Sequence, residues 1–335
     1  SLATSRNQLG GAGTLSQGLA FGGATPTVVT ATEEYNSNIN AFTPAAWSAG
    51  GSMNTTRKYM AGLGTRSAAL AAGGSTSSPG TNETPNSEEY DGTSWTEGNN
   101  LATSRYGLGG AGVQTSSVAA GGRSPAGSAL TNSEEYNGTS WTGTPSLNTG
   151  RRYLSGFGAS ETAALVTGGT VGGAPGGGTA QTATEEYNGS SWASVGSLNT
   201  AKNSTSGNAC GIESAGLMVS GNAGNEEYNG TSWSEVGDTN TSNNGGSVAG
   251  SQTSAVYAGS NGESTLSELY NGTSWITSAS LATGRGYGGG AGATNATGTI
   301  FGGKNSPTAP KTTNVTEEFN GETTSVITAS TLTTS

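Results

Sequence analysis

The motif Glu-Glu-Tyr-Asn-Gly-Thr-Ser-Trp at residues 134–141 recurs along the chain and constrains its fold more than any other feature. Its aromatic anchor occurs seven times, with a mean spacing of about 47 residues. A unit of this length, made of short strand signals, is typical of a β-propeller blade. Propellers commonly contain about four to eight blades. The repeat therefore predicts an all-β fold, a single seven-bladed β-propeller with four antiparallel strands per blade.

The copy at residues 101–142 shows the expected order of strands. A small-residue strand at 106–113 is expected to line the axis, where blades converge. The second strand ends at a double glycine, the third carries the glutamates and the tyrosine, and the fourth begins at Trp141 after an Asn-Gly hairpin turn. The predicted blades span residues 1–49, 50–99, 100–146, 147–196, 197–237, 238–279 and 280–335. No borrowed strand is obvious at the seam, so we expect the first and last blades to close the ring by packing.

Composition excludes several functional classes. The net charge is -10 with 12 Lys and Arg, and these cations are not clustered as binding to a phosphate backbone requires. No apolar run is long enough to span a membrane. The chain has no histidine and one cysteine, which excludes disulfides within the chain and histidine chemistry. The start, SLATSR, has no initiator Met, so we expect a processed product or part of a longer protein.

The aromatic pair of each copy is expected to pack between neighbouring blades, because a chain poor in Leu, Ile and Val needs large apolar side chains in its core. A sugar-stacking platform in each blade is the alternative. The fixed hairpin position of the pair favours packing, since binding residues are more often found in variable loops. The predicted inter-blade residues are Tyr35, Tyr90, Tyr136, Tyr187, Tyr228, Tyr270, Phe319, Trp47, Trp95, Trp141, Trp192, Trp233 and Trp275.

Thirteen of the 22 acidic residues lie in the glutamate pairs. Adjacent residues of a strand face opposite sides, so the two carboxylates of a pair do not converge on one catalytic or metal site. We expect the second glutamate to pair with a basic residue on the first strand of the same blade. The predicted ion-pair residues are Arg6, Arg57, Arg105, Arg151, Lys202, Arg285, Glu34, Glu89, Glu135, Glu186, Glu227 and Glu318. The copy with Asn243 in the basic position also has Leu269 in place of the second glutamate.

Three further motifs have simple structural explanations. Residues 107–112 spell GxGxxG, a dinucleotide fingerprint, but no helix signal follows. The Asn-Gly-Thr/Ser sequences are formal glycosylation acceptors and are better explained as hairpin turns. Cys210 is expected to be a small core residue. We therefore expect no cofactor and no metal site.

The order Leu-x-Thr-x-Arg, small-residue strand, double glycine, Glu-x-Tyr-Asn/Asp and Trp resembles the kelch repeat across essentially all 335 residues. Tyr90 and Trp95 are slightly closer in sequence than in typical kelch repeats. The near-verbatim copies also resemble kelch-like virion and tail-associated proteins of marine phages. Kelch-type copper oxidases require histidine ligands, which are absent, and Asp91 directly precedes Gly92, unlike the Asp of a sialidase box. We therefore expect no enzyme activity.

The connections between second and third strands vary most in length, and rigid scaffolds commonly carry recognition on such loops. They lie at residues 24–30, 75–87, 123–133, 170–184, 222–225, 260–267 and 304–316. The resemblance to kelch propellers also implies binding on this face. Arg123, Lys304 and Lys311 are the candidate binding residues.

The sequence thus predicts a non-enzymatic structural or binding module of a virion tail, a fibre or a cell surface, in a virion or extracellular location. A carbohydrate-binding, lectin-like propeller is the alternative. The expected partners are other protein subunits of an assembly, or a surface glycan, with no nucleic acid and no membrane insertion.

Overall fold

The computed structural model describes residues 7–13, 17–28, 32–36, 39–77, 82–173, 177–203, 208–220, 224–241, 244–305 and 312–327. The chain divides into two compact units. The larger unit spans Ala45–Gly321. The smaller unit comprises Ser1–Pro44 together with Glu322–Ser335.

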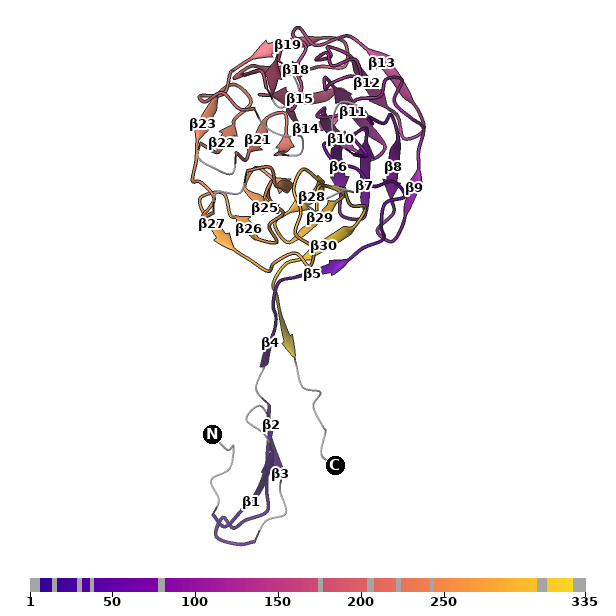
Figure 1. The fold of residues 1–335 in the computed structure, drawn as a ribbon. Helices are drawn as coiled ribbons and strands as arrows, with labels where there is room; N and C mark the ends of the chain where they lie inside the picture. The colour runs from indigo at the N-terminus through magenta and orange to yellow at the C-terminus, as the bar shows by residue number, and fades with distance from the viewer. Residues whose placement is uncertain are drawn as a thin grey trace. The chain divides into compact units, whose positions relative to one another are not determined.

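The larger unit is a ring of six four-stranded sheets, counted over its described residues (Figure 1). The first blade contains β6 (Ala61–Thr65), β7 (Ala68–Ala72), β8 (Ser87–Tyr90) and β9 (Trp95–Glu97). The second contains β10 (Gly109–Val113), β11 (Ser116–Ala120), β12 (Ser133–Tyr136) and β13 (Trp141–Thr144). The third contains β14 (Ser155–Ser160), β15 (Ala163–Thr167), β18 (Thr184–Tyr187) and β19 (Trp192–Val195).

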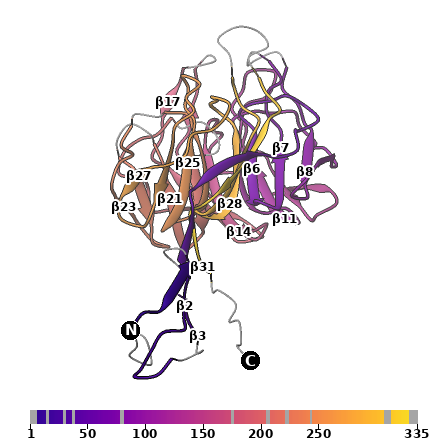
Figure 2. The same cartoon turned by 90° about the horizontal axis from the view of Figure 1, so that it is seen from below.

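The other three blades follow the same order. The fourth contains β20 (Ala209–Ile212), β21 (Ala215–Met218), β22 (Glu226–Tyr228) and β23 (Trp233–Glu235). The fifth contains β24 (Ser247–Ser251), β25 (Ser254–Ala258), β26 (Ser267–Tyr270) and β27 (Trp275–Thr277). The sixth contains β28 (Gly289–Thr294), β29 (Thr297–Phe301), β30 (Thr316–Asn320) and, from the beginning of the chain, β5 (Ala46–Ala49). The strands run between the two faces of the ring (Figure 2).

The prediction of four antiparallel strands per blade is confirmed, and the prediction of seven blades is wrong. The sixth blade takes its outermost strand from β5, in which Trp47 lies opposite Phe319. The ring therefore closes through a hydrogen-bonded strand pair, whereas packing alone was expected. Of the predicted first blade, residues 1–49, only β5 belongs to the ring. Thr324, which stands where a seventh tryptophan would be, lies outside the ring.

The inner strand of each blade is rich in glycine and alanine, as predicted, and it lines the axis. In the second blade β10 pairs with β11, β11 with β12 and β12 with β13. A double glycine ends the second strand with positive φ, as at Gly121 (65°) and Gly122 (100°). Only glycine adopts these angles without strain, so the glycine pair allows the chain to turn away from the sheet at the end of the second strand.

The Asn-Gly turn differs from the two-residue type I′ turn that we expected. Tyr136 lies opposite Trp141, so four residues connect the strands. Gly138 has positive φ, and the Asn137 Oδ1 accepts hydrogen bonds from the backbone N–H groups of Thr139 and Ser140, both at 2.9 Å. The asparagine therefore folds the turn through its side chain.

The smaller unit contains a three-stranded sheet and a two-stranded ribbon. The sheet comprises β1 (Gly10–Gly13), β2 (Gln17–Phe21) and β3 (Thr32–Asn36), and we call it the N-terminal sheet. The ribbon pairs β4 (Ile39–Thr43) with β31 (Thr323–Ile327). A second ribbon, β16 (Thr170–Val171) with β17 (Thr179–Ala180), lies in the connection between β15 and β18 of the third blade. No helix in the described part of the chain is long and apolar enough to cross a membrane.

Candidate binding site at the ring axis

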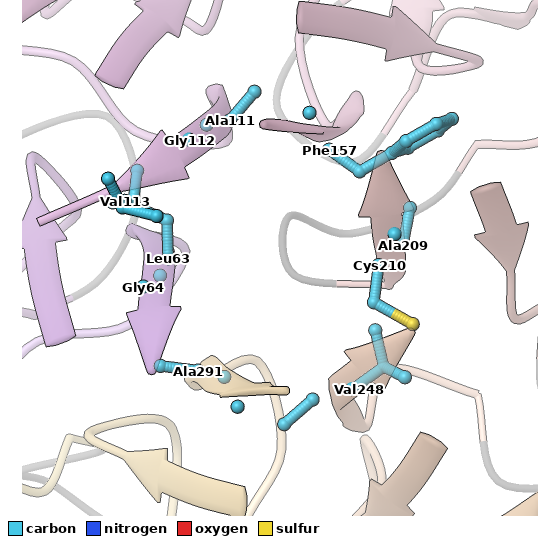
Figure 3. A pocket seen from close by; sticks show the side chains of 18 of the residues that line it. Leu63, Gly64, Ala111, Gly112, Val113, Phe157, Ala209, Cys210, Val248 and Ala291 are labelled. Carbon is cyan, nitrogen blue, oxygen red and sulfur yellow. The ribbon is translucent and has the colours of Figure 1, made fainter. Parts of the chain in front are cut away.

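A cavity of about 380 Å³ lies at the axis of the ring. Its walls are the six inner strands, β6, β10, β14, β20, β24 and β28. The side chains around the open centre include Leu63, Phe157, Cys210 and Val248 (Figure 3). The residues that line the cavity carry no charged side chain. Burial raises the pKa of the Cys210 thiol to about 12, so this thiol stays protonated at neutral pH.

The inner strands approach one another so closely that some positions accept only glycine. A Cβ at Gly156 would lie 2.8 Å from the Gly110 nitrogen and 2.7 Å from the Gly110 oxygen. At the ends of the inner strands β10 and β20, apolar side chains reach solvent. Val113 is 40% exposed there and Ile212 is 45% exposed.

Four tyrosines gather at the other end of the inner strands. The ring centroid of Tyr59 lies 5.9 Å from that of Tyr106, 5.6 Å from that of Tyr153 and 4.6 Å from that of Tyr287. The Tyr153 hydroxyl donates to the Tyr106 hydroxyl at 3.3 Å. Burial raises the pKa of the Tyr287 phenol to about 12, so this phenol is uncharged at neutral pH. We call these four residues the axial tyrosine cluster.

A chain of backbone hydrogen bonds between blades holds this cluster in place. Tyr59 N–H donates to the Tyr287 carbonyl at 2.9 Å, Gly107 N–H to the Tyr59 carbonyl at 2.7 Å, and Tyr153 N–H to the Gly107 carbonyl at 2.6 Å. These bonds require positive φ, which is 56° at Tyr59 and 55° at Tyr153. A bulky residue with positive φ is rare and tends to mark functional or over-determined sites.

Three cations contact the edge of the axial tyrosine cluster. Lys58 Nζ lies 5.7 Å from the Tyr59 ring centroid. The guanidinium carbon of Arg123 lies 5.8 Å from the Tyr106 ring centroid, and Arg152 has the same distance to the ring of Tyr153. These are distances at which cation–π attraction operates.

The candidate binding residues predicted from the loops have different environments. Arg123 is buried and donates to the Tyr106 hydroxyl at 3.0 Å and to the Gly127 carbonyl at 3.2 Å. Lys304 is partly exposed and forms an ion pair with Glu263. Lys311 lies outside the described residues. Arg123 therefore contacts the axial tyrosine cluster rather than lying on an exposed loop surface.

Isolated bridges join the inter-blade links to the starts of the variable loops. Lys58 pairs with Ser75, Tyr106 with Arg123, and Gly286 with Lys304. The variable loops therefore begin beside the axial tyrosine cluster, and we call this side of the ring the loop face.

The predicted ion pairs form with the other glutamate of each pair. Arg57 donates to Glu88 at 2.8 Å and Arg151 to Glu185 at 2.7 Å. Arg105 pairs with Glu134, and Arg285 with Glu317. The prediction that the second glutamate pairs with the arginine is wrong. The arginine lies in the link before the inner strand, on the side of the sheet that the first glutamate faces. Burial lowers the pKa of each of the four arginines, and the charge of its glutamate partner acts in the opposite direction and raises that pKa.

The remaining predicted members are placed differently. Lys202 donates to the Gly224 carbonyl at 2.7 Å. Arg6, Asn243 and the side chain of Glu34 lie outside the described residues. The first glutamate also accepts hydrogen bonds from the link backbone, as Glu88 does from Asn54 N–H at 2.6 Å. These carboxylates therefore fix the link between blades.

The second glutamate accepts a hydrogen bond from the tyrosine of the next blade. Tyr187 donates to Glu135 at 2.7 Å, Tyr270 to Glu227 at 2.9 Å and Tyr90 to Glu318 at 2.7 Å, and Tyr136 donates to Glu89. Burial, together with the bond to Glu318, raises the pKa of Tyr90 to about 12. The Tyr228 hydroxyl is the exception, because it has no hydrogen-bond partner among the described residues.

Leu269 and Phe319 explain the exception in the repeat. Leu269 replaces the second glutamate of the fifth blade, and the next blade has Phe319, which lacks a hydroxyl. The two side chains pack in one apolar cluster with Trp47. Loss of the acceptor thus accompanies loss of its donor in the neighbouring blade, rather than loss of the arginine.

The Tyr–Trp pairs pack between blades, as expected. Tyr90 and Trp95 have ring centroids 5.0 Å apart, and Trp95 lies 4.8 Å from Phe301 of the preceding blade. Tyr187, Tyr228 and Tyr270 are at most 1% exposed. Such buried rings offer no stacking face to a sugar. The side chain of Tyr35 lies outside the described residues.

The axial tyrosine cluster was not predicted from the sequence. Its signal was a tyrosine two residues after the repeated arginine, at Tyr59, Tyr153 and Tyr287. The second blade shifts its tyrosine to position 106 and places a glycine at 107, which obscures the pattern.

Among the described residues, no group of three or more His, Cys, Asp or Glu residues has the geometry of a metal site.

The ring places the chain among the β-propellers. The solved structure of YjhT is similar to it, with a TM-score of 0.60 and 15% sequence identity, covering 82% of this chain and 99% of that chain. At this identity the likeness supports the fold alone. No protein-family model matches the chain, and no curated protein matches it.

Proposed function

We propose that the chain is a kelch-type propeller that acts as a non-enzymatic binding module of a virion tail, a fibre or a cell surface. Its partner, another protein subunit or a surface glycan, binds on the loop face. The observation that carries this proposal is the axial tyrosine cluster, which is edged by cations and framed by loops of unequal length. Tyrosine and arginine are the residues most enriched at binding hot spots.

The use of the repeated polar groups also supports the proposal. Arg105 and Glu134 bind each other between the link and the third strand, while Glu135 accepts from Tyr187. Groups held in this way serve the scaffold. Tyr59 and Tyr153 are only half-buried, so that part of each ring remains accessible on the loop face.

The test is a binding screen of the chain against acidic and neutral oligosaccharides and against anionic and cationic peptides, followed by calorimetry on each ligand found. We expect one ligand per chain, recovered chemically unchanged. Tyr153→Asn should weaken binding at least about tenfold, within the range of a hot-spot loss. Asparagine is chosen because it tolerates positive φ better than alanine.

Ile276→Ala is the matched control, because Ile276 is 55% exposed on the outer strand β27. This variant should bind as the wild type does. Binding that survives Tyr153→Asn, or a ligand that is chemically converted, would contradict the proposal. Several equivalent sugar sites per chain would favour the lectin-like alternative.

A further inference from the structure

Arg123 differs from the arginines of the repeat because it has no acidic partner. The four buried arginines of the repeat each pair with a glutamate. Arg123 is 6% exposed and forms no ion pair within the described residues. It donates instead to two neutral groups, the Gly127 carbonyl at 3.2 Å and the Tyr106 hydroxyl at 3.0 Å. Since a buried charge without an opposite charge is costly, this guanidinium favours an anionic partner.

Tyr106 and Tyr153 extend this group of donors. The Tyr106 hydroxyl accepts from Arg123 and lies 3.3 Å from the Tyr153 hydroxyl. Each phenol carries one hydrogen. Whichever of the two phenols donates to the other, one hydrogen remains without an acceptor among the described residues. Buried polar groups normally have a hydrogen-bond partner, so the chain from Arg123 to Tyr153 lacks an acceptor at its end.

These donors are accessible from the loop face. Tyr153 is half-buried, and Gly127 lies next to the Nη2 of Arg123. A Cβ at Gly127 would be 3.0 Å from this nitrogen, so a side chain there would cover it. The Nη2 donates no hydrogen bond within the described part of the chain. The Nη2 and the free phenol hydrogen are thus available to one acceptor group.

Two positive charges act on the Tyr153 hydroxyl. The guanidinium carbon of Arg152 lies 5.8 Å from the Tyr153 ring centroid. Burial raises the pKa of Tyr153, and the charges of Arg152 and Arg123 act in the opposite direction. The whole chain has a net charge of -10 and therefore repels polyanions. The local and the net charge together favour a ligand with one anionic group on a neutral body.

We propose that the ligand of the loop face carries a single carboxylate, which accepts from the Nη2 of Arg123 and from the free phenol hydrogen of the Tyr106–Tyr153 pair. This inference rests on the function proposed above and specifies the chemistry of its ligand. A carboxylate accepts several hydrogen bonds at once. Its bonds to a guanidinium are about twice as strong as those between neutral groups, so a carboxylate binds here more tightly than an amide of the same shape.

The test compares acids with their amides by calorimetry on the full chain. One arm uses capped peptides with a single central Asp, and the same peptides with Asn. The other arm uses oligosaccharides that end in one uronic acid, and the same oligosaccharides with that acid converted to its amide. We expect ligands in one arm, each binding at least about tenfold more tightly as the acid than as the amide. That arm identifies the source of the carboxylate.

Arg123→Gln should remove the preference for the acid, because it keeps donors and loses the charge, whereas Arg123→Lys should retain part of it. Arg66→Gln is the matched control and should keep the full preference. It also removes one positive charge, but Arg66 lies in the turn between β6 and β7, at the other end of these strands from Lys58 and Ser75. Its side chain is 34% exposed. Urea unfolding followed by tryptophan fluorescence shows whether each variant is folded.

Two results would overturn this inference and leave the proposed function standing. The first is a set of ligands that Tyr153→Asn weakens but that bind equally as acids and as amides. The second is a preference for the acid that is the same in Arg123→Gln as in the wild type. The first comparison requires no change at Arg123, so it decides even if Arg123→Gln does not fold. If no probe binds, or if Tyr153→Asn has no effect, the proposed function fails together with this inference.

Discussion

The two glutamates of each repeat bind different parts of the ring, although they are adjacent in sequence. Glu134 lies with Arg105 in the same blade, and Glu135 accepts from Tyr187 of the next blade. Strand alternation predicts that the two carboxylates point to opposite faces. It does not predict which one meets the arginine, because that depends on the path of the link before the inner strand.

The tyrosine–glutamate contact between blades is testable by a double-mutant cycle at Glu135 and Tyr187. Each single change, Glu135→Leu or Tyr187→Phe, leaves a polar partner unsatisfied and should cost about 1–3 kcal/mol of unfolding free energy. The double variant reproduces the Leu269–Phe319 pair and should cost less than the sum. Urea denaturation measures all four proteins. Additive costs would show that the contact carries no coupling energy.

At the level of strands, β5 explains why seven motif copies make six blades. The aromatic anchor occurs seven times, but tryptophan occurs six times. Trp47 lies twelve residues after Tyr35, and this long interval lets β5 leave its own copy and pair with β30. The number of complete Tyr–Trp pairs, once Trp47 is assigned to Phe319, would have given the correct count. Local spacing alone did not reveal that assignment, because a strand pair closing a ring joins residues far apart in the sequence.

The closing role of β5 predicts a large effect of Trp47→Ala. Trp47 packs 5.0 Å from Phe319 between ring centroids, and its indole N–H donates to the Ala279 carbonyl at 2.9 Å. Truncation should lower the unfolding free energy of the ring by about 3 kcal/mol. Phe42→Ala is the control, since Phe42 is 59% exposed on β4. Equal effects of the two changes in thermal unfolding would exclude closure by β5.

At the level of the whole ring, the inner strands set its size. Their small residues were predicted from the glycine-rich repeat, and so was their place at the axis. The axial tyrosine cluster was not, because backbone bonds that link four blades hold tyrosines at positive φ, and no single repeat contains that information. The ring is thus predictable from the positions that repeat in every blade. The candidate site is only partly predictable, because it depends on positions that differ between blades.

The close approach of inner strands predicts that Gly156→Ala destabilises the ring. The φ of Gly156 is not in the positive range, so alanine suits its conformation, and the cost comes from contact with the Gly110 backbone. Such overpacking should cost about 1–3 kcal/mol. Gly143→Ala is the control, because a Cβ there would meet nothing within 4 Å. Thermal unfolding followed by near-ultraviolet circular dichroism compares the two, and equal midpoints would refute the argument.

The strand pair that closes the ring also determines how the ring would respond to mechanical force. The chain enters at Ala46 and leaves at Asn320, which lie opposite each other at one end of the β5–β30 ladder. Tension on the two flanking segments would therefore load the ladder in an unzipping geometry, one residue pair at a time. In the two flanking segments, Thr43 lies opposite Thr323 in the β4–β31 ribbon. If the force acts on the chain outside this ribbon, the hydrogen bonds between β4 and β31 must break before tension reaches the β5–β30 ladder. The ribbon would therefore delay the opening of the ring.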